Sequence, residues 1–211
     1  MSQLLAQFDN SNKPTHIIYI STSGVYGDCQ GQWVDETRPP KPKTDRARRR
    51  LAAEQALLGW GDTHHTPITI LRVGGIYGPN QLPLERLAAG MEILNLAEAP
   101  YSNRIHSHDL VSVCIAAARP TNQSEIYNVC DGQTSSMSEY FLTLARIAKL
   151  PAPKQLSKEE AQTKLSPAML SYLQESRRMD ISKLKRELKI DFLYPNLEAG
   201  LIASLDQETS T

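Results

Sequence analysis

The sequence predicts an α/β fold built on a doubly wound parallel sheet. Residues 16–20, 68–73 and 125–129 form short, mostly apolar segments, as expected of strands buried on both faces. The first two segments run into glycine-containing turns, Ser21–Gly27 and Leu71–Pro79. A helical segment lies between them, and a strand–helix–strand order of this kind gives a right-handed parallel crossover. Ligands of such sheets bind at the carboxyl ends of the strands, where both turns lie.

Within the first 61 residues, several residues mark where the predicted helices begin and end. Residues 2–8 are expected to end a helix before the break at 9–14. Gly31 and three prolines between 28 and 43 predict a surface loop. Thr44 is the expected N-cap of the following helix, whose apolar residues recur at helical spacing. Gly59 and Gly61 are expected to end it.

The remaining elements follow from the same signals. Ser107 is the expected N-cap of a helix over 109–118, and Asp131-Gly132 forms a turn after the strand 125–129. The other expected elements are a strand over 103–106 and helices over 83–96, 136–149, 158–165, 167–175, 181–188 and 196–205.

Composition excludes several classes of function. Among 211 residues, 23 are Lys or Arg and 23 are Asp or Glu, so no nucleic acid or acidic membrane is expected as a partner. Cys29, Cys114 and Cys130 are far apart, which indicates reduced thiols. The chain starts without a signal-peptide pattern and has no apolar run of about 18 residues. A soluble, cytoplasmic protein is expected.

Five motifs occur in an order that resembles a known family. They are Ser21–Gly27, Leu71–Pro79, Arg104–Leu110, Tyr127–Val129, and Met179–Leu184 followed by Leu197–Leu201. Together they resemble the extended short-chain dehydrogenases/reductases, the NAD-dependent epimerase/dehydratase superfamily. The chain also resembles an atypical YeeZ-type branch of that superfamily in lacking the tyrosine of the family's Tyr-x-x-x-Lys pair. The resemblance implies a Rossmann-like sheet with a small, mainly helical substrate lobe, NAD or NADP as cofactor, and a small, sugar-linked substrate.

The chain departs from the family pattern at its start. Family members carry a Gly-x-x-Gly-x-x-Gly turn that holds the dinucleotide, and no such turn precedes residue 16. The resemblance therefore implies the C-terminal part of the fold: residues 1–80 as a partial NAD(P)-binding segment, and 81–211 as substrate-lobe elements interleaved with the last strands. A truncated chain, weak dinucleotide binding and an open sheet edge are expected. A homodimer or a companion chain would cover that edge.

The resemblance also assigns catalytic roles. Thr22 takes the family's Ser/Thr position that hydrogen-bonds the reacting oxygen, and Ser23 is a second candidate. The alternative is that both hydroxyls only satisfy backbone groups of the turn. The family's Tyr-x-x-x-Lys pair aligns with Arg46 and Arg50. An arginine keeps its proton at neutral pH, so Arg46 is expected to contact substrate rather than transfer protons. Arg50 is expected to bind the cofactor, unless these arginines only form a solvated helix face.

Further contacts are expected around the second turn. Val73, Gly74 and Gly75 correspond to backbone beside the nicotinamide, although simple turn geometry explains the glycines equally well. Tyr26, Arg104 and His106 are the remaining candidates for substrate binding; for Tyr26, packing within the turn is the first expectation. His106 and His108 lack an evident third ligand, so no metal site is expected.

Three hypotheses about function remain open at this point. The first is an NAD(P)-dependent oxidoreductase or epimerase-like enzyme, favoured by the Thr22 turn and the C-terminal lobe. The second is a catalytically inactive dinucleotide-binding protein, favoured by Arg46 and Arg50. The third is a fragment without function of its own, favoured by the missing phosphate turn.

Overall fold

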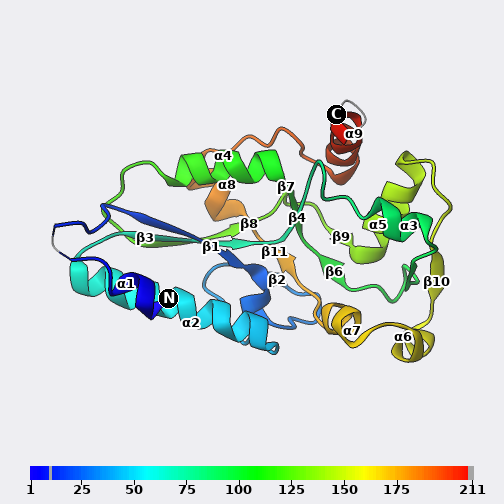
Figure 1. Ribbon diagram of the computed structural model, residues 1–211, viewed down its shortest axis with the longest axis horizontal. Helices are drawn as coiled ribbons and strands as arrows, with labels where there is room; N and C mark the ends of the chain where they lie inside the picture. The colour runs from blue at the N-terminus through cyan, green and yellow to red at the C-terminus, as the bar shows by residue number, and fades with distance from the viewer. Residues whose placement is uncertain (10, 209–211) are drawn as a thin grey trace.

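A three-stranded parallel sheet forms the centre of the molecule (Figure 1). The computed structural model describes residues 1–9 and 11–208. The strand order is β1 (Ile17–Thr22), β3 (Ile68–Val73) and β8 (Glu125–Val129), and β1 pairs with β3 from Ile17↔Ile68 to Thr22↔Val73. The predicted α/β fold class with a parallel sheet is confirmed.

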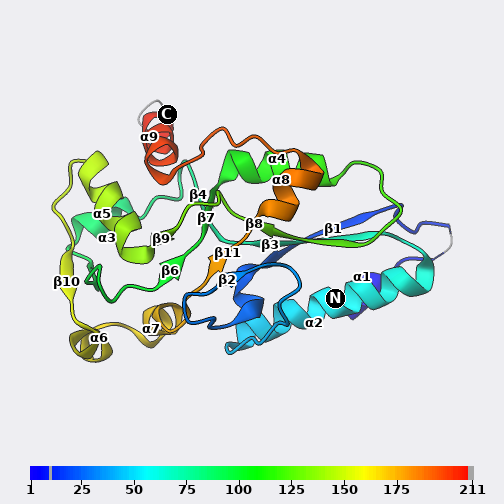
Figure 2. The same cartoon turned by 180° about the vertical axis from the view of Figure 1, so that it is seen from behind.

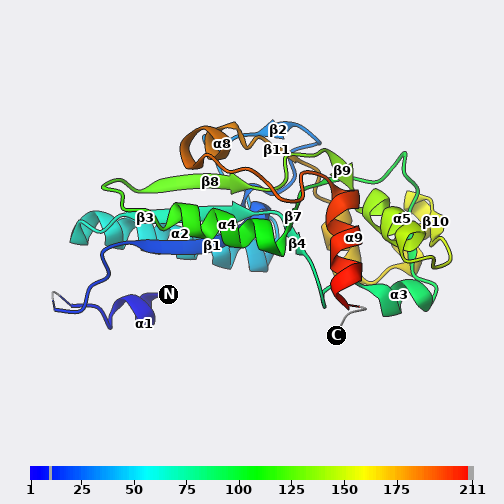
Figure 3. The same cartoon turned by 90° about the horizontal axis from the view of Figure 1, so that it is seen from above.

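Helices cover both faces of this sheet. One face packs on α2 (Asp45–His64) and α1 (Ser2–Leu5), and the other on α4 (Ser107–Ala117) and α8 (Ser182–Leu188), as Figures 1 and 3 show. Successive strand residues point to opposite faces, so Ile70 packs with the α2 side and Leu71 with the α4 side. Within the described part of the chain, every helix is too short or too polar to cross a membrane.

A smaller, mainly helical lobe lies at the carboxyl ends of the strands (Figure 2). Its core contains Phe141, Leu144 and Leu201. The lobe consists of α3 (Leu84–Ala88), α5 (Met137–Ile147), α6 (Lys158–Lys164), α9 (Leu197–Glu208) and the pair β5 (Glu92–Leu94) and β10 (Lys154–Leu156).

Short elements join the sheet to the lobe. They are the 3₁₀ turn η1 (Ser23–Tyr26), helix α7 (Pro167–Leu173) and three strand pairs: β2 (Trp33–Val34) with β11 (Arg178–Met179), β4 (Gly75–Tyr77) with β7 (Arg104–His106), and β6 (Tyr101–Ser102) with β9 (Ser135–Ser136).

Of two predictions about α2, the helix between β1 and β3, one is confirmed and one was wrong. Thr44 is the N-cap of α2, as predicted, and its hydroxyl accepts from Ala47 N. The prediction that Gly59 and Gly61 end this helix was wrong, since α2 continues to His64 and His65 adopts the left-handed conformation. A Cβ on Gly61 would lie 2.6 Å from the Thr66 carbonyl oxygen, so glycine here permits close helix–strand approach instead.

Two predictions beyond the second turn were also wrong. The segment 83–96 is not one helix: α3 is followed by Gly90 at a φ of +80°, and the next residues form β5, which pairs with β10. Ser107 is the first residue of α4 rather than its cap. The cap is His106, whose Nδ1 accepts from His108 N.

The outer edge of β1 has no neighbouring strand in the part of the chain that the structure describes. Ile20 on this strand is 44% exposed. The open edge agrees with the expectation drawn from the resemblance. Such an edge leaves backbone donors and acceptors available for another strand.

A buried ion pair fixes α2 against the sheet. Arg72 Nη2 on β3 donates to Glu54 Oε2 at 2.8 Å, and both side chains are at most 4% exposed. Ser21 on β1 also donates to Glu54. The Arg72 guanidinium lies 4.8 Å from the centre of the Tyr26 ring, whose hydroxyl donates to Asn128 Oδ1 on β8 at 2.8 Å. This network joins α2 to all three strands.

Replacing Glu54 by glutamine leaves Arg72 buried without a charged partner. Glu54→Gln is expected to lower the free energy of unfolding by about 3–5 kcal/mol, as measured by urea denaturation. Arg48→Gln is the matched control in the same helix. It removes the exposed Arg48–Asp45 pair and is expected to change stability by less than about 1 kcal/mol. Equal effects of the two substitutions would contradict a special role for the buried pair.

Candidate functional site

A cavity of about 410 Å³ lies where the carboxyl ends of β1 and β3 meet the helical lobe. Thr22, Ser23, Arg46, Arg50 and Arg104, all predicted from the sequence as site residues, line it. The other lining residues are Gly24, Thr44, Ala47, Gly74, Gly75, Pro100, Tyr101, Ser102, Asn103, Met137, Tyr172, Glu175 and Arg177. The fold therefore gathers both glycine-containing turns and the start of α2 around one space.

Thr22 and Ser23 form the turn at the end of β1. The Thr22 hydroxyl accepts from Gly24 N at 3.2 Å and so caps η1, as the structural alternative anticipated. A hydroxyl that accepts one hydrogen bond still has a proton to donate. Thr22 is half-buried and lines the cavity, while Ser23 is 7% exposed. The capping role and a contact with a ligand oxygen are therefore compatible.

The parallel register places the second turn beside Thr22. Val73 pairs with Thr22 across the sheet, and Gly74 N donates to the Val129 carbonyl at 2.9 Å. A Cβ on Gly74 would lie 2.6 Å from the Asn103 carbonyl oxygen, so the backbone requires glycine there. Gly75 is exposed on the cavity wall, whereas Val73 is 2% exposed and lies behind it.

Arg46 and Arg50 reach the cavity from the first turns of α2. Arg46 Nη1 donates to the Tyr172 hydroxyl at 2.7 Å, and its guanidinium lies 4.3 Å from the centre of the Tyr172 ring. Arg50 Nη1 donates to the Tyr19 hydroxyl at 3.1 Å. Both arginines therefore hold tyrosines rather than carboxylates, and both keep donors for a ligand.

Arg104 reaches the cavity from β7, which pairs with β4 in the register Gly75↔Arg104. Its guanidinium lies 4.0 Å from the centre of the Tyr140 ring. Burial lowers the pKa of Arg104. The nearby Asp131 accepts from Gln133 N at 2.9 Å, and burial raises its pKa to about 6 despite the opposing effect of Arg104.

Three predicted site residues do not line the cavity: Val73, which lies in the core, Tyr26 and His106. Tyr26 is 1% exposed and is held by Arg72 and Asn128, as the packing interpretation expected. His106 is fully buried, and its Nε2 lies 3.1 Å from Ser204 Oγ. Burial, with a further contribution from His108, lowers the pKa of His106. His106 joins β7 to α9, so we do not carry it into the proposed binding site.

Sequence reasoning missed the contribution of α7 and the segment after it. Tyr172, Glu175 and Arg177 line the cavity, and Arg177 Nη1 donates to Gly27 O at 2.6 Å and to Glu175 Oε2 at 2.9 Å. Ser102 on β6 was missed as well. The adjacent basic residues Arg177 and Arg178 were the one local signal, and they give no indication that Arg177 contacts Gly27, 150 residues earlier in the chain.

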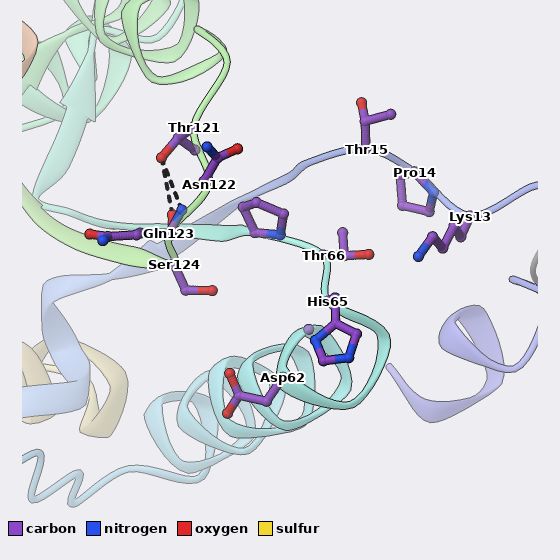
Figure 4. A pocket seen from close by; sticks show the side chains of 12 residues that line it. Lys13, Pro14, Thr15, Asp62, His65, Thr66, Thr121, Asn122, Gln123 and Ser124 are labelled. Carbon is purple, nitrogen blue, oxygen red and sulfur yellow. Dashed lines mark hydrogen bonds between the residues drawn. The ribbon is translucent and has the colours of Figure 1, made fainter.

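A second hollow lies at the opposite end of the sheet, and Figure 4 shows its lining side chains. Loops 13–15 and 121–124 and the end of α2 around Asp62 and His65 form it. It surrounds the amino ends of the strands, whereas ligands of open α/β sheets bind at the carboxyl ends. Within residues 1–9 and 11–208, no group of three or more His, Cys, Asp or Glu residues is arranged to hold a metal ion.

Comparison with known proteins identifies the family. The model of the NAD dependent epimerase/dehydratase family matches residues 1–130, more than half of the chain. The chain belongs to this family. The curated protein YeeZ of Escherichia coli strain K12 is 27% identical over 184 residues, which cover 85% of this chain and 59% of YeeZ. The resemblance to the extended short-chain dehydrogenase/reductase superfamily drawn from the motifs is confirmed, and YeeZ is one of the relatives that the chain is similar to.

Solved structures agree with this assignment. A conserved protein of unknown function from Silicibacter pomeroyi superposes with a TM-score of 0.82 at 31% identity, covering 98% of this chain and 70% of that one. UDP-glucuronic acid 4-epimerase from Bacillus cereus, solved with UDP-glucuronic acid and NAD, gives 0.77 at 25% identity, covering 99% and 65%. The chain thus spans about two thirds of these structures and about three fifths of YeeZ.

The raised pKa of Asp131 predicts a pH-dependent effect of Asp131→Asn. In the unfolded chain this carboxyl ionises near pH 4, and in the folded chain near pH 6. Ionisation therefore destabilises the fold progressively from about pH 4 to 6, by about 2–3 kcal/mol in total. The amide retains the acceptor for Gln133 N without the charge.

Urea denaturation at two pH values checks this. Asp131→Asn is expected to be more stable than the unmodified chain at pH 7.5 and equally stable at pH 4. An equal loss of stability at both pH values would show that burial does not destabilise the charged form.

Proposed function

We propose that the chain is the substrate-side part of an NAD(P)-dependent oxidoreductase of the epimerase type, acting on a nucleotide-sugar-like substrate. The register that sets Thr22 beside Val73 and the exposed Gly75 carries this proposal. It brings a hydroxyl donor next to a backbone that a flat ring can approach closely. Family membership and the Bacillus epimerase structure with NAD support it.

The cofactor, NAD or NADP, would lie with its nicotinamide along Val73–Gly75, and Arg50 would donate to its ribose or phosphate oxygens. A bound nicotinamide supplies hydride transfer. Weak binding by this chain alone is proposed, because its sequence has no glycine-rich phosphate turn before β1. Backbone N–H groups of such a turn normally provide the dinucleotide with most of its phosphate contacts.

The chain's own hydroxyls would act on the reacting oxygen. The Thr22 hydroxyl, which only accepts in its contact with Gly24 N, would donate a hydrogen bond to the substrate oxygen, with Ser23 beside it. Arg46 stays protonated and orients Tyr172 across the cavity. These groups bind and position a carbonyl or hydroxyl of the substrate.

A catalytically inactive dinucleotide-binding protein is the second candidate. The observation that favours it is the engagement of Arg46 and Arg50 with tyrosine hydroxyls at the helix positions where the family resemblance places Tyr and Lys. In this arrangement Arg46 has no proton to exchange near neutral pH. Turnover measurements separate the two candidates.

The variant Gly75→Ala tests whether the nicotinamide contacts Gly75. The fold accommodates the added Cβ, because it would lie 3.3 Å or more from the flexible Arg104 side chain and the Asn103 carbonyl oxygen. Saturation-transfer NMR with NAD and NADP is expected to show transfer to the nicotinamide protons, and Gly75→Ala to weaken binding about tenfold, or about 1.4 kcal/mol. Gly59→Ala, whose Cβ meets nothing within 4 Å, is the matched control. Unchanged saturation transfer in Gly75→Ala would show that the nicotinamide does not contact Gly75.

The expected weak binding of the dinucleotide is tested by calorimetric titration of the chain with NAD and NADP. A low-micromolar affinity would contradict it.

Turnover is tested by mixing the chain with NAD or NADP and UDP-glucuronic acid, and following absorbance of the reduced cofactor. The enzyme proposal expects slow reduction that Thr22→Val abolishes, because the valine lacks the donor. The inactive-binder candidate expects no reduction by the unmodified chain and a gain of turnover in Arg46→Tyr. Reduction unaffected by Thr22→Val would remove Thr22 from the reaction.

A further inference from the structure

The two edges of the central sheet differ in how their backbone groups are satisfied. In a parallel strand, successive residues direct their N–H and C=O groups to opposite edges. Ile17 N donates to Pro67 O at 3.0 Å on the β3 side, so Ile18 and Ile20 direct their groups outward from β1. Within residues 1–9 and 11–208, these outward groups of Ile18 and Ile20 have no hydrogen-bond partner. The β1 edge is therefore open to a further strand.

The opposite edge, along β8, is closed by side chains. Glu36 Oε1 accepts from Asn128 N at 2.8 Å, and Lys183 Nζ donates to Ile126 O at 3.0 Å. Both backbone groups point away from β3, since it is the Val129 carbonyl that bonds on the inner side. Side chains that occupy an edge in this way prevent the addition of a strand. In the described part of the chain, the central sheet therefore has one open edge, at β1.

The helix next to this edge has an outer face without acidic residues, lysine or arginine. Seen from above, α4 lies on the β1 side of the sheet and α8 on the β8 side (Figure 3). The exposed residues of α4 are His108, Val111, Ser112 and Ile115. Its one acidic residue, Asp109, is buried. The exposed face of a surface helix normally carries charges, as α2 does with Arg48, Arg49 and Asp62. The outer face of α4 is therefore suited to burial.

The exposed apolar residues of α4 lie on the side of the helix that faces the open edge. The other flank is occupied, since Asp109 accepts from a backbone N–H at 2.7 Å in the segment after α8. Val111 and Ile115 are 55% and 68% exposed and lie one turn apart, on the flank away from Asp109. Ile20 is 44% exposed, and its side chain shares the α4 face of the sheet with Ile18. We call Ile20, Val111 and Ile115, together with the open edge, the β1–α4 surface.

We propose that the β1–α4 surface binds a second copy of this chain, with the two β1 strands paired antiparallel across a two-fold axis perpendicular to the sheet. Centred on Ile20, this pairing opposes Ile20 to its own counterpart and Ile18 to the counterpart of Thr22. Every outward residue of β1 then gains backbone hydrogen bonds. The axis keeps both α4 helices on one face of the joined sheet, where the apolar residues of the two copies cover each other.

Three observations favour a second copy over another occupant. The chain has 23 basic and 23 acidic residues, so two copies carry no net charge that would repel them. The β1–α4 surface itself has no charged side chain, and an uncharged apolar surface is complementary to itself. Each copy has one open edge of the central sheet, so the pairing leaves none and the assembly stops at two chains. The inference does not depend on the proposed function, which concerns the cavity.

The mass of the chain in solution tests the proposal. Analytical ultracentrifugation over a roughly hundredfold range of concentration is expected to show a reversible dimer, with twice the mass of one chain, at the upper end. A monomer at every concentration would overturn the proposal and leave the edge to a strand of another polypeptide. Larger assemblies that grow with concentration would contradict the closed two-fold pairing.

A charge on α4 tests where the interface lies. Ile115→Glu places a carboxylate at a position that is already 68% exposed, so the fold tolerates it, but the dimer would bury it. The dissociation constant of the dimer is expected to rise by about tenfold or more. Leu96→Glu is the matched control, because Leu96 is 49% exposed on the helical lobe, and its dimer is expected to be unchanged. Equal dissociation constants of the two variants would place the interface elsewhere and overturn the proposal.

Two substitutions of Ile20 separate backbone pairing from apolar contact. Ile20→Ala removes the side chain and keeps the N–H group, whereas Ile20→Pro removes both. Proline is tolerated in an edge strand where the N–H faces outward, so the β1–β3 ladder is expected to survive. Ile20→Pro is expected to weaken the dimer further than Ile20→Ala. Equal weakening by the two substitutions would contradict hydrogen bonding between the strands.

A cross-link tests the register, and it keeps the proposal testable if Ile20→Pro fails to fold. Opposed residues of an antiparallel pair have Cα atoms about 5.5 Å apart, within the range of a disulfide. Ile20→Cys, in a Cys114→Ser background, is therefore expected to form a disulfide-linked dimer on oxidation. A dimer that does not cross-link would contradict pairing at Ile20. Saturation transfer to the nicotinamide protons, measured in Ile115→Glu, tests the proposed function separately from the dimer.

Discussion

The buried pair of Glu54 and Arg72 is the interaction on which the site depends. Glu54 lies one turn beyond Arg50 and two turns beyond Arg46, so fixing it against β3 fixes the direction of both arginines. Its bond from Ser21 also holds the strand residue that precedes Thr22. A buried ion pair adds little net stability compared with apolar packing, but it strongly disfavours any other placement of the two charges. The main effect of the Glu54–Arg72 pair is therefore to fix the position of α2 against the sheet.

The second constraint is the joint between the sheet and the helical lobe. β4 leaves β3 through Gly74, where the Asn103 carbonyl approaches too closely for any side chain. The same strand places Tyr77 against Gly200 of α9. Because Gly75 and Arg104 are paired in register within this joint, β7 brings the Arg104 cation to the turn that ends β3. The cavity is a consequence of how these two bodies meet.

Several side chains that line the cavity are already held in place. Thr22 is held by its own turn, Arg46 and Arg50 by tyrosines, and Arg177 by Gly27 O. These existing hydrogen bonds already hold the side chains whose other donor groups could bind a ligand. Few side chains would therefore become ordered when a ligand binds.

Local pattern determined the three strands of the central sheet, the turns that follow them and the N-cap Thr44, because these depend on residues within a few positions of each other. The family resemblance, rather than local pattern, named Thr22, Ser23, Arg46, Arg50 and Arg104 as candidates, and all five line one cavity. Only the tertiary structure revealed that Gly61 serves helix–strand approach, that 83–96 divides to pair with β10, and that His106 is buried. Tyr172, Glu175 and Arg177 join the site through contacts more than a hundred residues distant in sequence, which no local periodicity encodes.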